Sequence, residues 1–452
     1  MTKKLSDKIP VTSMTDEDRI AGLFGGKLTT TRISDFVKHI KGDDELLLQQ
    51  IAWYYEPNVA AAKGASAINI GGNLHMFAIF DSLVEQTLMD KNGNYCLLNP
   101  DDARYTEDGE AVVDSSTGEI LSKWAHCDFM NILPEHYVYV QIVNVAGVSR
   151  ERIWVSPIAI PNGVKREKMV VARFKASVVD NVMRSLPNKV PANEKTINAF
   201  WDCAQARSKD HGLANHGFRT FLLEYMFCKY GQRDSQNCTT AAGTLVWGVG
   251  LDGTESTGSG WDLFIKQSNI VTGHTLSLGR NDGKVAVADA DGNTVHGVNV
   301  LGFENPWGRY WEMVQGLCSV GNDVYCWNSN WLPTGTPDAA SFAKVDHVTL
   351  KRHTAETDIK CKFNVVTSAD KQGLYPVPAS YDSALNYGDY YWYANDGQLW
   401  LWGGDSSHGA HCGLACSYSD AVWSGSFASI SARLAFYGTT KKVSSKQLAV
   451  LA

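Results

Sequence analysis

The sequence predicts an α+β protein in which an irregular antiparallel sheet and two helices are connected by long loops. Alternating side chains, as in Tyr137–Val140, indicate strands, whereas two segments between residues 196 and 229 repeat their apolar residues at helical spacing. After Cys238 helical periodicity largely disappears, and glycine-rich loops alternate with short strands. The 40 glycines and 14 tryptophans in 452 residues fit a loop-rich fold with large aromatic side chains in its core.

The composition excludes several classes of protein. A hydrophobic content of 44% and a charged content of 20% are those of a folded globular protein, which excludes wholesale disorder. The formal charge of -7 argues against a protein that coats nucleic acid, because phosphate binding requires clusters of Lys and Arg. No segment approaches the roughly 18 apolar residues of a membrane-spanning helix, so we expect no membrane insertion.

The ten cysteines predict reduced, buried thiols. They form no CxxC pair and no short-chain disulfide pattern, so neither a zinc site nor a disulfide scaffold is indicated. The first residues, MTKKLSDKIPV, lack the apolar core of a secretory signal. We therefore expect a chain that folds in a cytoplasm and carries no cofactor.

Residues 1–57 are expected to form an N-terminal region that contains a short helix. Pro10 and Gly25–Gly26 separate short apolar pieces, and Ser34 is expected to cap a helix. In Asp43–Tyr55 apolar residues recur at helical spacing behind an acidic start. This pattern predicts a helix that packs either against copies of itself or into its own domain.

Residues 58–124 are expected to form a small β-rich connector, and residues 125–452 the main domain. Hairpin signals at Gly71–Gly72, Asn92–Asn94 and Glu107–Glu110 predict the connector. In the main domain we expect strands at Tyr137–Val140, Glu151–Ile160 and Lys284–Ala290, helices at Thr196–Ser208 and His216–Lys229, and a strand or short helix in residues 441–452.

The segment Leu301–Gly316, LGFENPWGRYWEMVQG, has the most unusual amino-acid composition in the chain. Its large aromatic side chains each bury much apolar surface, and its glycines let backbone and rings pack closely. We expect a buried core motif in which Glu304 and Asn305 satisfy backbone groups around Trp307.

This segment resembles the core signature of the C-type-lectin-like fold of the formylglycine-generating-enzyme type, and more closely the variant found in phage tail-fibre and receptor-binding proteins. Three further segments resemble that family in the same order: a strand in Asn131–Val140, a helix in Gly217–Gln236, and a closing hairpin region in Leu401–Phe436. The resemblance implies that residues 125–452 form one C-type-lectin-like receptor-binding domain. The core motif that it implies consists of Glu304, Asn305, Trp307, Trp311, Gly403, Gly404 and Arg433.

The resemblance also implies a function, that of a phage virion fibre protein without catalytic activity. Its N-terminal region would dock to other virion proteins, and its C-terminal domain would bind a glycan or protein on the host-cell surface non-covalently. By the same analogy the protein is a homotrimer, in which avidity raises a weak single-site affinity. The alternative on the same modular plan is a head fibre or capsid decoration protein with a structural or adhesive role.

The ligand-binding surface is expected in the last loop region, where rigid aromatic and adaptable polar side chains are interspersed with glycine as in a paratope. In lectin-like phage proteins this region faces the ligand; an ordinary solvent-facing loop is the alternative. The ligand-binding residues expected on this basis are Asp405, Ser407, His408, His411, Tyr418, Asp420, Trp423, Ser424 and Phe427.

An oxidase of the formylglycine-generating type is a further alternative. Such enzymes carry a redox-active Cys pair near the last hairpin, and Cys412 and Cys416 follow Gly403–Gly404, but their spacing is one residue shorter than in the enzymes. We expect structural thiols instead. We also expect no metal site, because no fourth ligand accompanies Asp405, His408 and His411, and the Asp-Gly loops at 281–283 and 289–293 match turns better than calcium sites.

Overall fold

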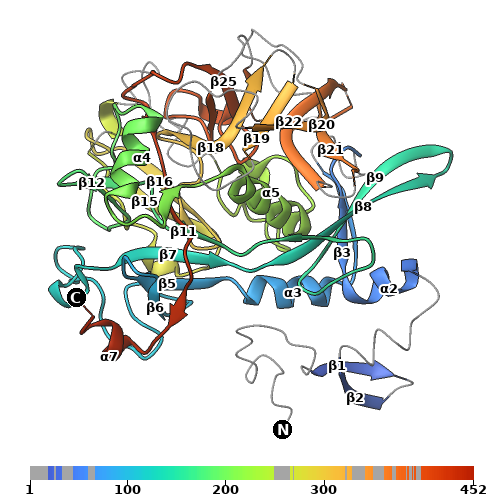
Figure 1. Cartoon of the computed structure of the whole chain (residues 1–452), viewed down its shortest axis with the longest axis horizontal. Helices are drawn as coiled ribbons and strands as arrows, with labels where there is room; N and C mark the ends of the chain where they lie inside the picture. The colour runs from blue at the N-terminus through green and yellow to red at the C-terminus, as the bar shows by residue number, and fades with distance from the viewer. Residues whose placement is uncertain are drawn as a thin grey trace.

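The computed structural model describes residues 19–24, 27–32, 44–59, 67–248, 265–267, 269–320, 323–327, 342–349, 361–368, 373–382, 384–385, 389, 391–392 and 399–451. These residues form an α+β fold in which antiparallel sheets dominate and a few helices pack between and beside them (Figure 1). The α+β class predicted from the sequence is therefore confirmed.

A seven-stranded sheet joins distant parts of the chain. Its order is β14-β27-β11-β7-β5-β6-β28. Strands β5 and β6, from the segment expected to be a connector, thus share a sheet with strands of the main domain. The bounds are β5 Glu85–Met89, β6 Asn94–Leu97, β7 Asp128–Leu133, β11 Met169–Ala172, β14 His211–Leu213, β27 Leu434–Phe436 and β28 Lys441–Lys442.

A five-stranded sheet carries a protruding arm. Its order is β10-β8-β9-β3-β4, with β3 Trp53–Glu56, β4 Asn69–Gly72, β8 His136–Val145, β9 Val148–Ser156 and β10 Val164–Arg166. Strands β8 and β9 continue beyond their neighbours as a two-stranded arm (Figure 1). The arm turns at Ala146 and Gly147, which both have positive φ, as a two-residue hairpin loop requires.

A second seven-stranded assembly contains the aromatic segment. Its path is β20-β19-β18-β24-β25-β23, and β26 joins β18 in parallel. Within it, β18 pairs with β24 and β26, so the aromatic segment lies beside residues far later in the chain. The bounds are β18 Trp311–Val320, β19 Asp323–Trp327, β20 Phe342–Thr349, β23 Tyr391–Trp392, β24 Leu399–Trp402, β25 Ser417–Ala421 and β26 Ile430–Ser431.

Smaller sheets and short helices complete the described chain. The small sheets consist of β1 Arg19–Phe24 with β2 Lys27–Arg32, β12 Ser177–Val179 with β13 Val182–Arg184, β15 Gly283–Ala288 with β16 Thr294–Val300 and β17 Phe303–Glu304, and β21 Cys361–Val366 with β22 Gly373–Tyr381. The 3₁₀ helices are η2 Ser122–Trp124, η3 Ser235–Asn237, η4 Leu276–Leu278 and η5 Gly409–His411.

The two helices predicted in the main domain are confirmed. Helix α4 spans Ile197–Gln205, and the Thr196 hydroxyl accepts a hydrogen bond from the backbone N–H of Ala199. Helix α5 spans His216–Tyr230 and ends at Gly231, whose φ of 60° forms a left-handed C-cap. It runs through the middle of the molecule (Figure 1), and its side chains from Phe218 to Cys228 are buried.

The prediction for residues 43–83 is partly wrong. Helix α2 spans only Asp44–Ile51, and Trp53–Glu56 form strand β3 because they pair with β9 on one side and β4 on the other. Gly71–Gly72 end strand β4 instead of forming a hairpin turn. Helix α3, Leu74–Ser82, was not expected. Asn73 caps its N-terminus, and apolar residues cover most of its surface.

The other predictions of local structure are either confirmed or concern residues outside the described ranges. The hairpin at Asn92–Asn94 is confirmed by the β5–β6 pairing, and the strand at Lys284–Ala290 by β15. The tail contains both a strand, β28, and a short helix, α7 Ser445–Leu448. The helix expected after Ser34 and the loop at residues 250–262 lie outside the described residues.

The core is aromatic, as the composition predicts. One large cluster of buried apolar side chains extends from Leu47 to Ala435 in the sequence and lies around α5. Seven tryptophans in the described residues are almost completely buried: Trp53, Trp124, Trp154, Trp247, Trp307, Trp400 and Trp402.

Candidate functional site

The predicted core motif is buried and satisfies backbone groups. The Glu304 carboxylate accepts hydrogen bonds from the backbone N–H of Gly273 and of Thr275, each at 2.9 Å, and from the Thr275 hydroxyl. The side-chain amide oxygen of Asn305 accepts from the backbone N–H of Val298 at 2.9 Å. The ring of Trp307 packs edge-on against another tryptophan, Trp247, with centroids 5.5 Å apart. The motif is therefore structural, because the polar side-chain atoms of Glu304 and Asn305 are used inside the fold.

Glu312 lies at the centre of a buried ionic cluster. Its carboxylate is 2.7 Å from Arg433, 2.8 Å from Lys175 and 3.0 Å from Arg219, and all four side chains are at most 3% exposed. Burial alone would raise the pKa of Glu312, but the three cations outweigh it and lower that pKa well below the usual range. The carboxylate is thus ionised and serves as a counter-ion for three cations that the core contains.

The four segments that carry the family resemblance meet at this motif. Asn131 donates from Nδ2 to the carbonyl of Gly302 at 2.9 Å. Arg219 pairs with Glu312, and Arg433 donates to the carbonyl of Glu304 at 3.1 Å. Segments that are up to 171 residues apart are therefore held together by direct hydrogen bonds.

Part of the predicted ligand-binding loop faces inward. Asp405 is buried and accepts from the backbone N–H of Ser407 and from Nδ1 of His408 at 2.8 Å. The His408 ring stands edge-on to Trp311 with centroids 5.1 Å apart. Trp423 is only 8% exposed. These side chains stabilise the loop, and Asp405 and Trp423 present little surface to a ligand.

Other predicted loop residues are accessible. Ser407, Ser424 and Phe427 are exposed, Phe427 to 47%, and Val422 beside them is exposed to the same extent. His411 and Tyr418 are half-buried. Asp420 lies in β25, but its side chain is outside the described set.

The geometry does not support a redox-active cysteine pair or a metal site. Cys412 and Cys416 are both completely buried, and the Cys412 thiol donates to the carbonyl of Asp405. Within the described ranges no group of three or more His, Cys, Asp or Glu side chains is arranged to hold a metal ion.

The Asp-Gly loop at 289–293 is a turn, whereas the one at 281–283 leads into β15 and bonds to side chains of α5. The Asp289 carboxylate accepts from the N–H of Asp291 and Asn293 and from the Asn293 amide. Asp90 makes the same set of hydrogen bonds in the β5–β6 turn. Asp282 accepts from Tyr225, Tyr230 and Lys229. These carboxylates are bonded by the protein itself: Asp90 and Asp289 form Asx turns, and Asp282 is held by side chains of α5.

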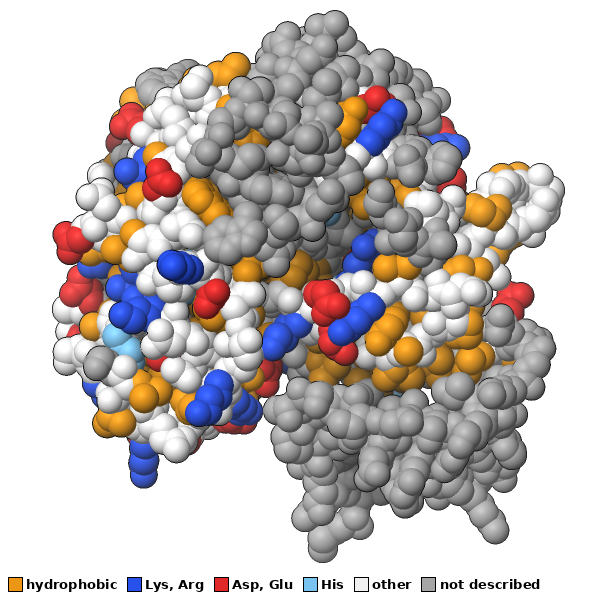
Figure 2. Space-filling model, in the orientation of Figure 1, with side chains coloured by type: hydrophobic (Ala, Val, Ile, Leu, Met, Phe, Trp, Pro, Cys, Tyr) orange, Lys and Arg blue, Asp and Glu red, His pale blue; other side chains and the backbone are white. Residues whose placement is uncertain are grey.

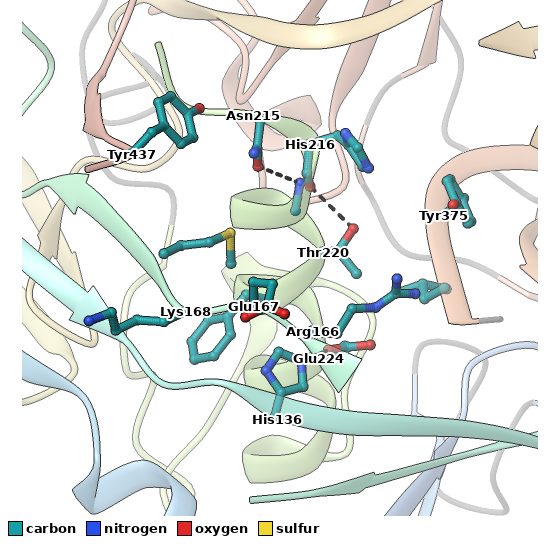
Figure 3. Close-up of a pocket in the computed structure, with 14 residues that line it drawn as sticks. His136, Arg166, Glu167, Lys168, Asn215, His216, Thr220, Glu224, Tyr375 and Tyr437 are labelled. Atoms are coloured by element: carbon teal, nitrogen blue, oxygen red, sulfur yellow. Dashed lines mark hydrogen bonds and ion pairs between the residues drawn. The ribbon is translucent and has the colours of Figure 1, made fainter. Parts of the chain in front are cut away.

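A cavity of about 220 Å³ opens beside the N-terminal half of α5 (Figure 3). Figure 2 shows the surface hollowed in this part of the molecule, with Lys and Arg side chains near the hollow. Segments far apart in the sequence contribute to its wall, including the start of β8, the β10–β11 connection, α5 and β22. The lining residues are His136, Arg166, Glu167, Lys168, Met169, Asn215, His216, Gly217, Thr220, Phe221, Glu224, Leu374, Tyr375 and Tyr437.

The floor of the cavity is a buried polar pair. Nε2 of His136 is 3.5 Å from the Glu224 carboxylate, and the Tyr55 hydroxyl donates to the other oxygen of Glu224 at 3.0 Å. His136 and Glu224 are 2% and 5% exposed. Burial, helped by Glu224, raises the pKa of Tyr55 far above its usual range, so Tyr55 stays a proton donor. A carboxylate is therefore fixed at the cavity floor.

One wall contains a neutral histidine. The His216 ring stacks on Tyr375 with centroids 6.1 Å apart, and its Nε2 is 3.8 Å from the sulfur of Cys326. Its Nδ1 is enclosed and has no hydrogen-bond partner among the described residues. Burial, with a smaller contribution from Arg166, lowers the pKa of His216 from 6.5 to about 4. At neutral pH this ring is therefore uncharged, and its Nδ1 makes no hydrogen bond to a described residue.

Sequence reasoning did not identify this cavity. The charged run Arg166–Glu167–Lys168 between two strands and the capping pair Asn215–His216 were available signals, but each is common in surface loops and helix starts. Only the fold brings them together with His136 and Tyr375.

Comparison of the sequence with family models and with curated proteins gives no match. Among the described helices none combines the length and apolar character needed to cross a lipid bilayer. The site must therefore be interpreted from its own geometry.

Proposed function

We propose that this protein is a phage virion fibre protein whose C-terminal, C-type-lectin-like region binds a ligand on the host surface non-covalently. Its N-terminal region docks to the particle, and the protein acts as a homotrimer, so that avidity raises a weak single-site affinity. The host cytoplasm is its place of synthesis and the virion its place of action.

One observation supports the proposal most strongly. The four segments chosen for their family resemblance are bonded to one another around Leu301–Gly316, through Asn131, Arg219 and Arg433. Unrelated chance resemblances, scattered from residue 131 to residue 436, have no reason to converge on one buried cluster. This convergence favours a common structural signature, and the function of the family that carries the signature is proposed from it by analogy of fold.

The exposed part of the last loop is the proposed contact surface. Val422 and Phe427 are each 47% exposed, and Ser424 lies between them. A solvent-facing aromatic ring with small polar neighbours is typical of a binding surface.

Binding of the full chain to bacterial cells and to arrayed surface glycans tests the proposal. We expect binding that a Val422→Ser, Phe427→Ser double variant weakens at least roughly tenfold, because an apolar anchor is lost from the contact. Val450→Ser, at an 80% exposed position in the tail, is the matched control. Absence of binding to every bacterial surface, or equal binding by the double variant and the control, would contradict the proposal.

A further inference from the structure

We infer that the cavity beside α5 is a second binding site, which holds one uncharged sugar unit. The site is separate from the last loop, since none of the residues expected there lines the cavity. Only the biological source of the sugar, a host polysaccharide, rests on the proposed function.

The volume of the cavity fits a single ring. An apolar cavity of about 150 Å³ holds benzene, so about 220 Å³ accommodates a six-membered ring with its substituents. Drug-sized ligands need larger pockets, of roughly 300–1,000 Å³. The ligand is therefore small, or it is the end of a longer chain that inserts one unit.

The charges of the lining select against an ion. The cations Arg166 and Lys168 are offset by the carboxylates of Glu167 and Glu224, and His216 is neutral at pH 7. A charged ligand would lose its hydration without a net opposite charge to replace it. An uncharged ligand does not carry this cost.

The lining offers many donors and acceptors and also apolar ring faces. Glu224 accepts hydrogen bonds at the floor, Asn215 and Thr220 contribute polar side chains, and the ring of His216 forms part of the wall with its Nδ1 enclosed. Phe221, Tyr375 and Tyr437 supply aromatic surface, and Figure 3 shows the polar side chains distributed around the same space. A sugar ring, with hydroxyls on its edge and C–H groups on its faces, matches this combination.

The experiment is a titration of the full chain, followed by ligand-observed NMR and calorimetry. The probes are neutral hexoses and N-acetylhexosamines with the corresponding uronic acids, at up to about 10 mM, which covers millimolar dissociation constants. A methyl glycoside of the best sugar distinguishes a chain end, which it mimics, from a free reducing sugar. We expect at least one neutral sugar to bind saturably and its uronic acid to bind at least roughly tenfold more weakly, because of the unreplaced hydration of the carboxylate.

Two pairs of variants locate the site. His216→Phe keeps the ring stacked on Tyr375 but removes both nitrogens, and Cys326→Ala removes only the sulfur next to Nε2, outside the cavity. Glu224→Gln changes the floor, and Glu110→Gln, which changes a surface partner of Lys123 outside the cavity, is its control. We expect the dissociation constant to rise at least roughly tenfold in His216→Phe and Glu224→Gln, because a buried partner is lost, and to change little in the two controls.

The inference is overturned if no sugar of the panel binds, if the uronic acids bind as tightly as the neutral sugars, or if His216→Phe and its control bind alike. These outcomes are separable from failure of the proposed function. Cell binding without sugar binding overturns this inference alone. Sugar binding without cell binding supports the cavity site and contradicts the proposed function.

Discussion

Arg433 donates a hydrogen bond to Glu312 at 2.7 Å across 121 residues of sequence. The same guanidinium also donates to the carbonyls of Ala172 and Glu304, so one side chain from the closing region contacts three strands, β11, β17 and β18. Arg433 is completely buried, and its planar fork provides several donors in fixed directions, which a lysine could not supply.

Removal of the Glu312 carboxylate should destabilise the protein strongly. Glu312→Ala leaves Arg433, Lys175 and Arg219 buried without a counter-ion, and we expect a loss of about 3–5 kcal/mol in the free energy of unfolding. Glu110→Ala removes only a surface partner of Lys123 and should cost less than about 1 kcal/mol. Urea denaturation of both variants measures the difference; equal losses would show that the cluster contributes no more than a surface ion pair.

Gly403 should tolerate no side chain. Its φ is 93°, and an added Cβ would lie 2.8 Å from the carbonyl oxygen of Pro306. Gly118 also has positive φ but has open space around it, so Gly118→Ala isolates the backbone cost of about 1–2 kcal/mol. We expect Gly403→Ala to lower the midpoint of thermal unfolding clearly more than Gly118→Ala does. A comparable shift in the two variants would refute the close approach at Gly403.

His211 and His216 should make stability fall as the pH falls from about 6.5 to 4, against the opposite contribution of Glu85 and Asp389, whose pKa values burial raises. Burial lowers the pKa of both His211 and His216 from 6.5 to about 4. In this window the unfolded chain binds protons that the folded chain excludes, so protons favour unfolding. Glu312, whose pKa is lowered in the folded state, adds to the loss below about pH 4.5.

Thermal melts at several pH values check this dependence. His211→Gln should flatten the slope between pH 6.5 and 4, because one of the excluded protons no longer contributes. His75, which is exposed, provides the control, and His75→Gln should leave the slope unchanged. A His211→Gln slope equal to that of the wild type would contradict the assignment.

Substitution of Cys412 or Cys416 by serine should leave ligand binding intact. Cys412 and Cys416 are completely buried, so Cys412→Ser and Cys416→Ser are expected to reduce stability modestly through packing and polarity. Copper titration of the wild-type chain provides the second measurement. Tight copper binding that either substitution abolishes would favour the oxidase alternative over a binding protein.

Local patterns predicted those parts of the fold that local interactions determine. Helix α5 carries its own N-cap and a glycine C-cap, and the β5–β6 hairpin has its turn sequence in Asn92–Asn94, so both could be identified from the sequence. Trp53–Tyr55 were mistaken for the end of a helix because their strand depends on partners in β9, about 100 residues later. The spacing of apolar residues within a short segment gives no information about those partners.

The cavity shows the same limit for function. Its lining comes from positions between His136 and Tyr437, and no short segment contains enough of it to form a motif. The last loop was identifiable because its residues are contiguous, but exposure within it was not. Asp405 is buried while it bonds to Ser407 and His408 of its own loop, and Trp423 is buried in a core cluster with residues from distant segments.

The Asp90 and Asp289 turns also bear on the order in which the protein folds. Each carboxylate binds backbone N–H groups two and four residues ahead, so these hairpins close loops of minimal length and need no distant partner. The Glu312 cluster, by contrast, requires closure of loops of 121 and 137 residues to reach Arg433 and Lys175. We therefore expect the two hairpins to form within microseconds, well before the cluster. A ribosome-bound chain that has not yet exposed Arg433 holds these hairpins but cannot complete its core.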